Sequence, residues 1–211
     1  MAKENEEMTG MVEETAVAEK SGKKTKRKKK EEKPESVLKT ILEYTLTILI
    51  TVTVCYLFVR FVAVRSVVDG SSMYPTLSNN DNLVLEKVTY YFHDPERFDI
   101  IVFELEDDPG THYIKRVIGL PGETVQIIDG EVYINGLKLE GDVYGKDRMI
   151  NAYTAAIPIV LKEDEFFVLG DNRNNSKDSR SVSVGPVNRS QILGRAFFRF
   201  WPLTEMKFLV K

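Results

Sequence analysis

One unbroken apolar run, residues 41–59, stands out in the pattern of hydrophobic and polar positions. As a helix rising ~1.5 Å per residue it would be about 28 Å long, close to the thickness of a bilayer's hydrocarbon core. Its one acidic residue, Glu43, lies one helical step after Lys39, so the two can pair near the headgroups. The pattern predicts a transmembrane helix over residues 37–64. A cleavable signal peptide is the alternative, but the run is long, and Phe61-Val62-Ala63 has no small residue three positions before a cut.

The residues on either side of this run predict its orientation. Residues 1–36 have no apolar period and change from acidic to basic, with eight Lys and Arg residues between positions 20 and 30. We expect a disordered tail. Only Arg60 and Arg65 follow the run closely, so the positive-inside rule predicts a cytoplasmic N-terminus and an extracytoplasmic C-terminal domain. The basic run also fits RNA or a localisation receptor, but attraction to anionic membrane lipid explains its position more simply.

Beyond residue 65 the period changes to that of β-strands. Residues 123–139 predict a three-strand meander, because its turns Asp129-Gly130 and Asn135-Gly136 favour the positive φ of type I′ hairpins. A loop or insertion is expected over residues 140–156. Further strands are predicted at residues 83–88, 100–103, 113–118, 166–169 and 192–200. The predicted fold class is mainly β, in one extracytoplasmic domain over residues 65–211.

Charge and cysteine content narrow the function classes. Residues 66–211 hold 16 basic and 22 acidic side chains, a net charge of −6, which argues against nucleic acid as a partner. The single cysteine, Cys55, lies in the apolar run, so an intrachain disulfide and a Cys-based metal site are excluded. With no credible cluster of ligands elsewhere, we expect neither a metal nor a cofactor.

Three polar segments carry the candidate chemistry. Ser72 lies in the Gly- and Pro-bearing residues 69–77, where a tight loop can expose a nucleophile, although an ordinary turn has the same composition. Lys115 lies in a predicted strand with Tyr113 and Val117 on its own face. To act as a base near pH 7 it needs a pKa lowered by roughly three units, about 4 kcal/mol, which burial can supply. A lysine that snorkels at a sheet edge is the alternative.

The third segment, residues 170–180, is rich in hydrogen-bonding side chains and suits either a loop that orients a partner or a solvated turn. The three segments read Ser-Met-x-Pro-Thr-Leu, Tyr-Ile-Lys-Arg-Val-x-Gly-Leu-Pro-Gly and Gly-Asp-Asn-Arg-x-Asn-Ser-x-Asp-Ser-Arg, and residues 98–103 add a fourth. In this order behind a membrane anchor, they resemble bacterial type I signal peptidases, of the Gram-positive type with one membrane span. The resemblance covers about residues 64–200.

This resemblance implies a membrane-anchored serine endopeptidase that cleaves secretory preproteins at the cell membrane, after small residues at −1 and −3 of the signal peptide. It implies an antiparallel β-sheet or barrel-like catalytic domain with a small, variable β-hairpin insertion around residues 123–165. Ser72 would be the nucleophile, with its N–H donating to the oxyanion, and Lys115 the general base, its amine oriented by Ser176. Asp178 matches a structural carboxylate, Asp171 and Arg116 a supporting ion pair, and Val68, Met73 and Ile114 the lining of substrate pockets, for which ordinary core packing is the alternative.

Two departures from the family pattern stand near these residues. Gly70 occupies a position where many Gram-negative relatives carry a hydroxyl that completes the oxyanion hole, so the second donor is open; Gram-positive relatives resemble this chain in having Gly. Asn174 stands where Asp is usual, and only a loop adjustment is expected.

Three other readings compete with this one. A histidine-based triad would need His93 or His112, but His112 lies on the strand face opposite Lys115 and His93 lies in a polar Asp-Pro segment. A self-cleaving Ser-Lys regulator would carry a DNA-binding domain and an internal Ala-Gly or Cys-Gly bond, and the chain has neither dipeptide. A non-catalytic anchored β domain would keep its function after Ser72→Ala and Lys115→Ala.

Overall fold

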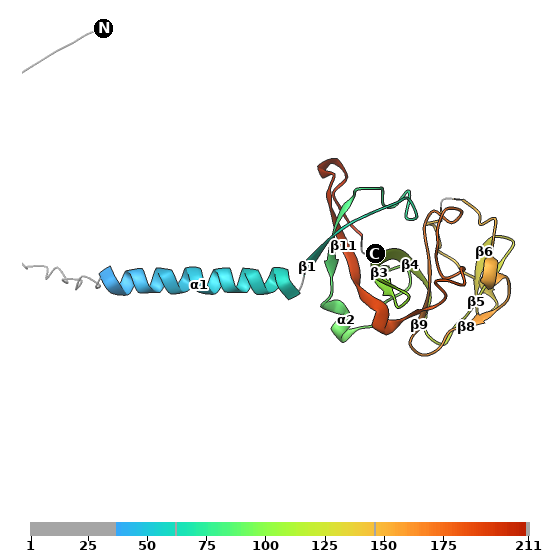
Figure 1. Ribbon diagram of the computed structural model, residues 1–211, viewed down its shortest axis with the longest axis horizontal. Coiled ribbons are helices and arrows are strands. Elements are labelled where there is room, and N and C mark those ends of the chain that lie inside the picture. The colour runs from blue at the N-terminus through green and yellow to red at the C-terminus, as the bar shows by residue number, and fades with distance from the viewer. Residues whose placement is uncertain (1–36, 62, 146, 210–211) are drawn as a thin grey trace, which may run out of the picture. The chain divides into compact units, whose positions relative to one another are not determined.

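The computed structural model describes residues 37–61, 63–145 and 147–209, so the predicted tail lies outside the described residues. Figure 1 shows α1 (Val37–Phe61) as one continuous helix. The side chains of residues 37–57 are not buried, and this stretch is long and apolar enough to cross a membrane. Lys39 and Glu43 form the expected pair one helical step apart, at 3.8 Å. The helix ends at Phe61, before the predicted boundary at residue 64, because Ala63 already pairs with a strand as extended backbone.

The larger of two antiparallel sheets has the strand order β1-β2-β11-β3-β4-β9-β10, and β12 pairs with β11. Because every neighbouring pair is antiparallel, β1 and β4 run in the same direction. The strands are β1 (Ala63–Val67), β2 (Asn82–Glu86), β3 (Ile100–Leu105), β4 (Asp108–Gly119), β9 (Glu165–Leu169), β10 (Val187–Asn188), β11 (Ile192–Trp201) and β12 (Lys207–Phe208). The mainly β, antiparallel fold class is confirmed.

The smaller sheet lies between β4 and β9 in the chain, within the predicted insertion. Its order is β7-β6-β5-β8, from β5 (Thr124–Ile128), β6 (Glu131–Ile134), β7 (Leu137–Lys138) and β8 (Ile159–Val160). The meander turns are as predicted: Asp129 and Gly130 have φ of 49° and 76°, and Asn135 and Gly136 have 52° and 81°. Short helical turns occur at α2 (Thr89–Phe92), η1 (Tyr153–Ala156), η2 (Arg189–Gln191) and η3 (Leu203–Glu205).

Strand β4 is buried on both faces at its C-terminal half. Val117 packs in a core cluster with residues of β3 and β9, whereas Ile118 packs in a second cluster with residues of the smaller sheet. At Gly119 the two sheets approach so closely that a Cβ atom would lie 2.5 Å from the Val125 side chain of the smaller sheet; it would also lie 2.9 Å from Phe167 of the neighbouring strand β9. This two-sided packing fixes β4, the strand that carries Lys115.

Candidate active site

The loop between β1 and β2 holds Ser72 at its turn. Backbone bonds from Val68 N to Asp81 O (2.9 Å) and from Asn80 N to Val68 O (2.8 Å) close its base. Met73 anchors it from inside, because its side chain is buried in a core cluster. The result is a tight loop in which Ser72 stays partly exposed while its neighbour is fixed in the core.

Lys115 lies directly beside this loop. Its Nζ donates to Ser72 Oγ at 2.8 Å and to the carbonyl oxygen of Ile114 at 2.8 Å. Within β4, Lys115 pairs with Ile101 of β3, but pairing with β9 begins only at Arg116. Lys115 therefore stands where the second edge of β4 becomes free, and it is nevertheless only 4% exposed.

The surroundings of the Lys115 amine disfavour its charged form. Burial lowers the pKa of Lys115 from its ordinary 10.5 to about 8, and the charges of Asp178 and Asp171 oppose this shift. Both carboxylates have an arginine partner: Arg180 Nε lies 2.8 Å from Asp178, and Arg116 Nη2 lies 2.6 Å from Asp171. Within the described part of the chain, no carboxylate lies within 4.0 Å of Lys115.

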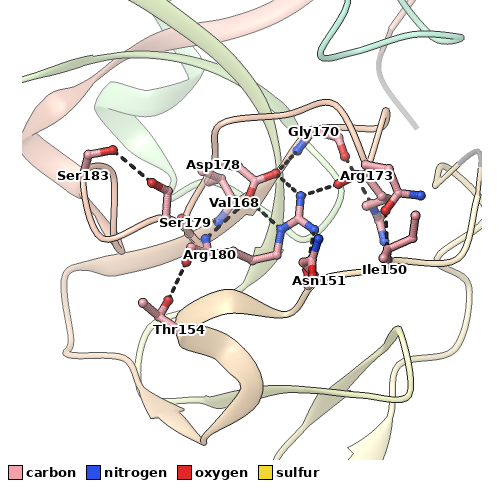
Figure 2. A network of polar contacts seen from close by, with 12 residues as sticks. Ile150, Asn151, Thr154, Val168, Gly170, Arg173, Asp178, Ser179, Arg180 and Ser183 are labelled. Carbon is pink, nitrogen blue, oxygen red and sulfur yellow. Dashed lines mark hydrogen bonds and ion pairs between the residues drawn. The ribbon is translucent and has the colours of Figure 1, made fainter.

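Asp178 organises the loop that follows β9 (Figure 2). Arg180 donates to both of its carboxylate oxygens, at 2.8 and 2.9 Å, and Gly170 N donates to one of them at 3.1 Å. Ser179 Oγ accepts a bond from Val168 N at 2.9 Å, which ties the far side of the loop to β9. All of these groups are buried, so the loop is rigidly built around the Asp178–Arg180 pair.

Two asparagines join this loop to the Ser72 loop, a role that the sequence reasoning missed. Asn172 donates through its backbone to Ser72 O (3.0 Å) and through its side chain to Ser71 O (3.1 Å). Asn175 donates to Ser71 Oγ at 3.0 Å. The density of hydrogen-bonding side chains in residues 170–180 was the only available signal, because it predicts a loop that binds something without naming the partner.

Ser176 is close to the site, but the structure does not join it to Lys115. Its Oγ is buried and has no hydrogen-bond partner among the described residues. Gly170 passes so near that a Cβ atom there would lie 2.2 Å from Ser176 Oγ and 2.5 Å from Ser72 O. Ser176 therefore packs beside the Ser72 loop, and its expected orienting role stays a prediction.

Arg116 and Asp171 form the expected ion pair behind the site. The guanidinium donates at 2.8 and 2.6 Å to the two carboxylate oxygens and at 2.8 Å to Phe98 O, and it lies 3.6 Å from the ring centroid of Tyr144. Asn174, the departure from the family pattern, is bonded to a neighbouring loop: its Oδ1 accepts from Ile150 N, and its Nδ2 donates to a backbone carbonyl there.

A groove of about 630 Å³ opens in front of Ser72 and Lys115. It runs between β1, the terminal strand of its sheet, and the N-terminal half of β4, which pairs with no strand of the described residues on its β9 side. The groove is lined by Arg65, Ser66, Val67, Val68, Asp69, Ser72, Val102, Gly110, Thr111, His112, Tyr113, Ile114, Lys115 and Lys177. Val68 and Ile114 line this groove, whereas Met73 is 1% exposed and does not; that these residues form substrate pockets stays a prediction.

The geometry gives less support to a histidine base or to a metal centre. His93 and His112 are both exposed, and the amine beside Ser72 Oγ belongs to Lys115. Among the residues described here, no three His, Cys, Asp or Glu side chains are placed to hold a metal ion.

Comparison with known proteins gives consistent matches. Residues 41–201 match the family described as signal peptidase, peptidase S26. Signal peptidase I S of Bacillus subtilis (strain 168) is 36% identical, over 80% of this chain and 94% of its own length. Probable signal peptidase I-2 of Synechocystis sp. is 44% identical, over 71% of this chain and 68% of its own. A crystal structure of a signal peptidase I from Enterococcus faecalis V583 is 34% identical, with a TM-score of 0.41 over 49% of this chain and 97% of that chain.

Proposed function

The chain belongs to the signal peptidase I family of serine endopeptidases, and on that premise we propose that it removes signal peptides from secretory preproteins with a Ser72/Lys115 dyad. The observation that carries the proposal is the 2.8 Å contact between Lys115 Nζ and Ser72 Oγ, made by an amine that is buried and has no carboxylate partner in the described part of the chain. A neutral amine at this distance can accept the hydroxyl proton, as an imidazole does in other serine peptidases.

The reaction follows from this geometry in two steps. As Lys115 takes the Ser72 proton, Oγ bonds to the scissile carbonyl carbon, and the Ser72 N–H stabilises the resulting oxyanion. Lys115 then gives the proton to the leaving amine, which leaves an acyl group on Ser72 and releases the mature N-terminus. A water molecule, deprotonated by the same amine, releases the signal peptide and restores Ser72.

The groove supports an extended peptide as the substrate. The free edges of β1 and β4 run in the same direction on its two sides, so one peptide strand can hydrogen-bond to both. Val68 and Ile114 line the groove beside Ser72, where the residues at −1 and −3 would lie. We propose that these shallow positions accept only small side chains.

Membrane attachment would place the site near its substrates. We propose that α1 spans the cell membrane with the N-terminus in the cytoplasm, in line with the basic residues before it. Ser72 follows Phe61 by only 11 positions, at most about 40 Å of extended chain. The nucleophile therefore stays near the membrane surface from which preprotein cleavage sites emerge.

The test is cleavage of a secretory precursor by the full chain in detergent, followed by sequencing of the new N-terminus. We expect cleavage after a small residue, and a loss of at least about 10³-fold in Ser72→Ala and Lys115→Ala. Lys115→Arg should also be inactive, because a guanidinium keeps its proton. The exposed Lys207→Ala is the matched control and should cleave normally. Wild-type rates in Lys115→Ala would rule out this base, and an uncleaved precursor would rule out the function.

A further inference from the structure

The groove differs in charge from the domain that contains it. Residues 66–211 have a net charge of −6, yet the charged groove residues besides Lys115 are two cations, Arg65 and Lys177, and one carboxylate, Asp69. Lys115 adds no charge in the neutral form that the proposed reaction needs. A peptide in the groove therefore meets a net positive surface inside an acidic domain.

Arg65 is held in place without being neutralised. Its Nε and Nη2 donate to Asn82 Oδ1 at 3.0 and 2.6 Å. Asn82 is itself fixed, because it is 8% exposed and its Nδ2 donates to Asn80 O at 3.0 Å. Within the described ranges, no carboxylate lies within 4.0 Å of Arg65. The guanidinium is thus held by a neutral amide of β2, on the side of β1 away from β4, and its full charge acts on the groove from there.

Lys177 supplies a second cation from the loop that follows β9. It is exposed, lines the groove and has no carboxylate within 4.0 Å among the residues that the structure describes. Hydrogen bonds from Tyr113 and Thr111 lower the pKa of Asp108, and the charge of Lys177 lowers it further. The electrostatic effect of Lys177 therefore extends to Asp108, which is the first residue of β4 and precedes Lys115 in that strand.

The register of a bound peptide follows from the strand geometry. Residues −1 and −3 would lie beside Val68, near Ser72. Arg65 lies three residues earlier in β1, about 10 Å away at the usual rise of a strand. Because the rest of the signal peptide continues in that direction, the positions about four to six residues before the cleaved bond would pass Arg65 and Lys177.

We propose that Arg65 and Lys177 select substrates by charge: they favour precursors with an acidic residue about four to six positions before the cleaved bond and disfavour those with a basic one. This selection rests on the proposed function and adds a charge criterion to the small side chains at −1 and −3. Each cation contributes a modest, salt-sensitive amount, because both are reached by solvent.

The experiment compares one precursor in three forms, with Asp, Asn or Lys at −5, and repeats the series at −4 and −6. The full chain is assayed in neutral detergent at low ionic strength. We expect kcat/KM to be about tenfold higher for Asp than for Lys, with Asn between them, and the ratio to shrink in high salt. The Asn form separates the two claims: if it is not cleaved, the proposed function fails; if all three forms are cleaved equally, only the charge selection fails.

Variants assign the effect to the two side chains. Lys177→Gln should lower the Asp-to-Lys ratio severalfold, and Arg65→Gln with Lys177→Gln should bring it close to one. Lys207→Gln removes an exposed cation outside the groove and should keep the full ratio. Lys177 makes no hydrogen bond among the described residues, so this single variant tests the proposal even if loss of the Arg65–Asn82 contact impairs folding. A ratio unchanged in Lys177→Gln and in the double variant would overturn it, as would an equal change in Lys207→Gln.

Discussion

The two faces of β4 bury cations in opposite surroundings. Lys115 and Arg116 are adjacent and are 4% and 3% exposed, but Arg116 has a carboxylate in bidentate contact, a carbonyl and an aromatic ring, whereas Lys115 contacts a hydroxyl and a carbonyl. Burial with a fully paired partner stabilises a charge, whereas burial among neutral groups lowers the pKa of an amine. One strand thus carries a permanent structural cation beside an amine that can give up its proton.

The arginines also protect the amine from the nearby acids. Asp171 and Asp178 both raise the pKa of Lys115, and each is in bidentate contact with an arginine. A carboxylate held in this way is less able to form its own ion pair with Lys115. The second face of β4 and the loop after β9 therefore help to keep the pKa of Lys115 low without touching its amine.

The largest expected effect on stability comes from replacing Arg116, which is paired with Asp171. Arg116→Met would leave the carboxylate of Asp171, which is fully buried, without its partner. We expect a loss of about 3–5 kcal/mol in the free energy of unfolding, measured by denaturant titration of the full chain in detergent. Arg148→Met, at an exposed arginine, is the control and should cost less than about 1 kcal/mol. Equal losses in the two variants would mean that the Arg116 pair is not a structural requirement.

Removing the buried cation on the other face of β4, Lys115, should raise the free energy of unfolding instead of lowering it. The pKa of Lys115 is about 8 in the folded chain and ordinarily 10.5, so the unfolded chain binds more protons between these values and stability from this site rises with pH. The penalty is complete below about pH 8, where it amounts to about 3 kcal/mol, and it is gone above about pH 10.5. Lys115→Met removes it.

Denaturant titrations of Lys115→Met and wild type at pH 7 and pH 10.5 measure this penalty. We expect the variant to be more stable at pH 7 by up to about 3 kcal/mol, less whatever the two lost hydrogen bonds contribute, and the advantage to disappear at pH 10.5. A stability difference that does not change with pH would show that Lys115 keeps its proton in the folded chain.

Local signals in the sequence predicted much of the fold. The Asp-Gly and Asn-Gly turns fixed the meander, and the apolar run predicted α1. The errors lie where pairing overrides local pattern. Residues 63 and 64 were predicted as the end of the helix but belong to β1, because they pair with β2. The polar residues 108–112 show no strand period, yet they belong to β4 and pair in part with β3. Such contacts join residues far apart in the chain and leave no local signature.

The candidate site was also predictable only where the signal is local in the sequence. Ser72 and Lys115 were named from their segments, and the structure brings them together. The contacts that hold them are another matter: Asn172 reaches Ser71 across about a hundred residues of sequence, and Asp142 pairs with Arg173 from a loop of the predicted insertion. Neither pairing can be read from composition or spacing, because each depends on how two loops meet in the folded domain.

Titration of Lys115 itself tests the central claim most directly. The full chain, with isotope-labelled lysine side chains, would be followed by NMR in detergent micelles across pH 6–11, with Lys115→Met used to assign the signal. We predict a pKa of about 8 for Lys115. A value near 10.5 would contradict the account, because the amine beside Ser72 would then be almost entirely protonated at pH 7, whereas a pKa of about 8 leaves roughly a tenth of it neutral.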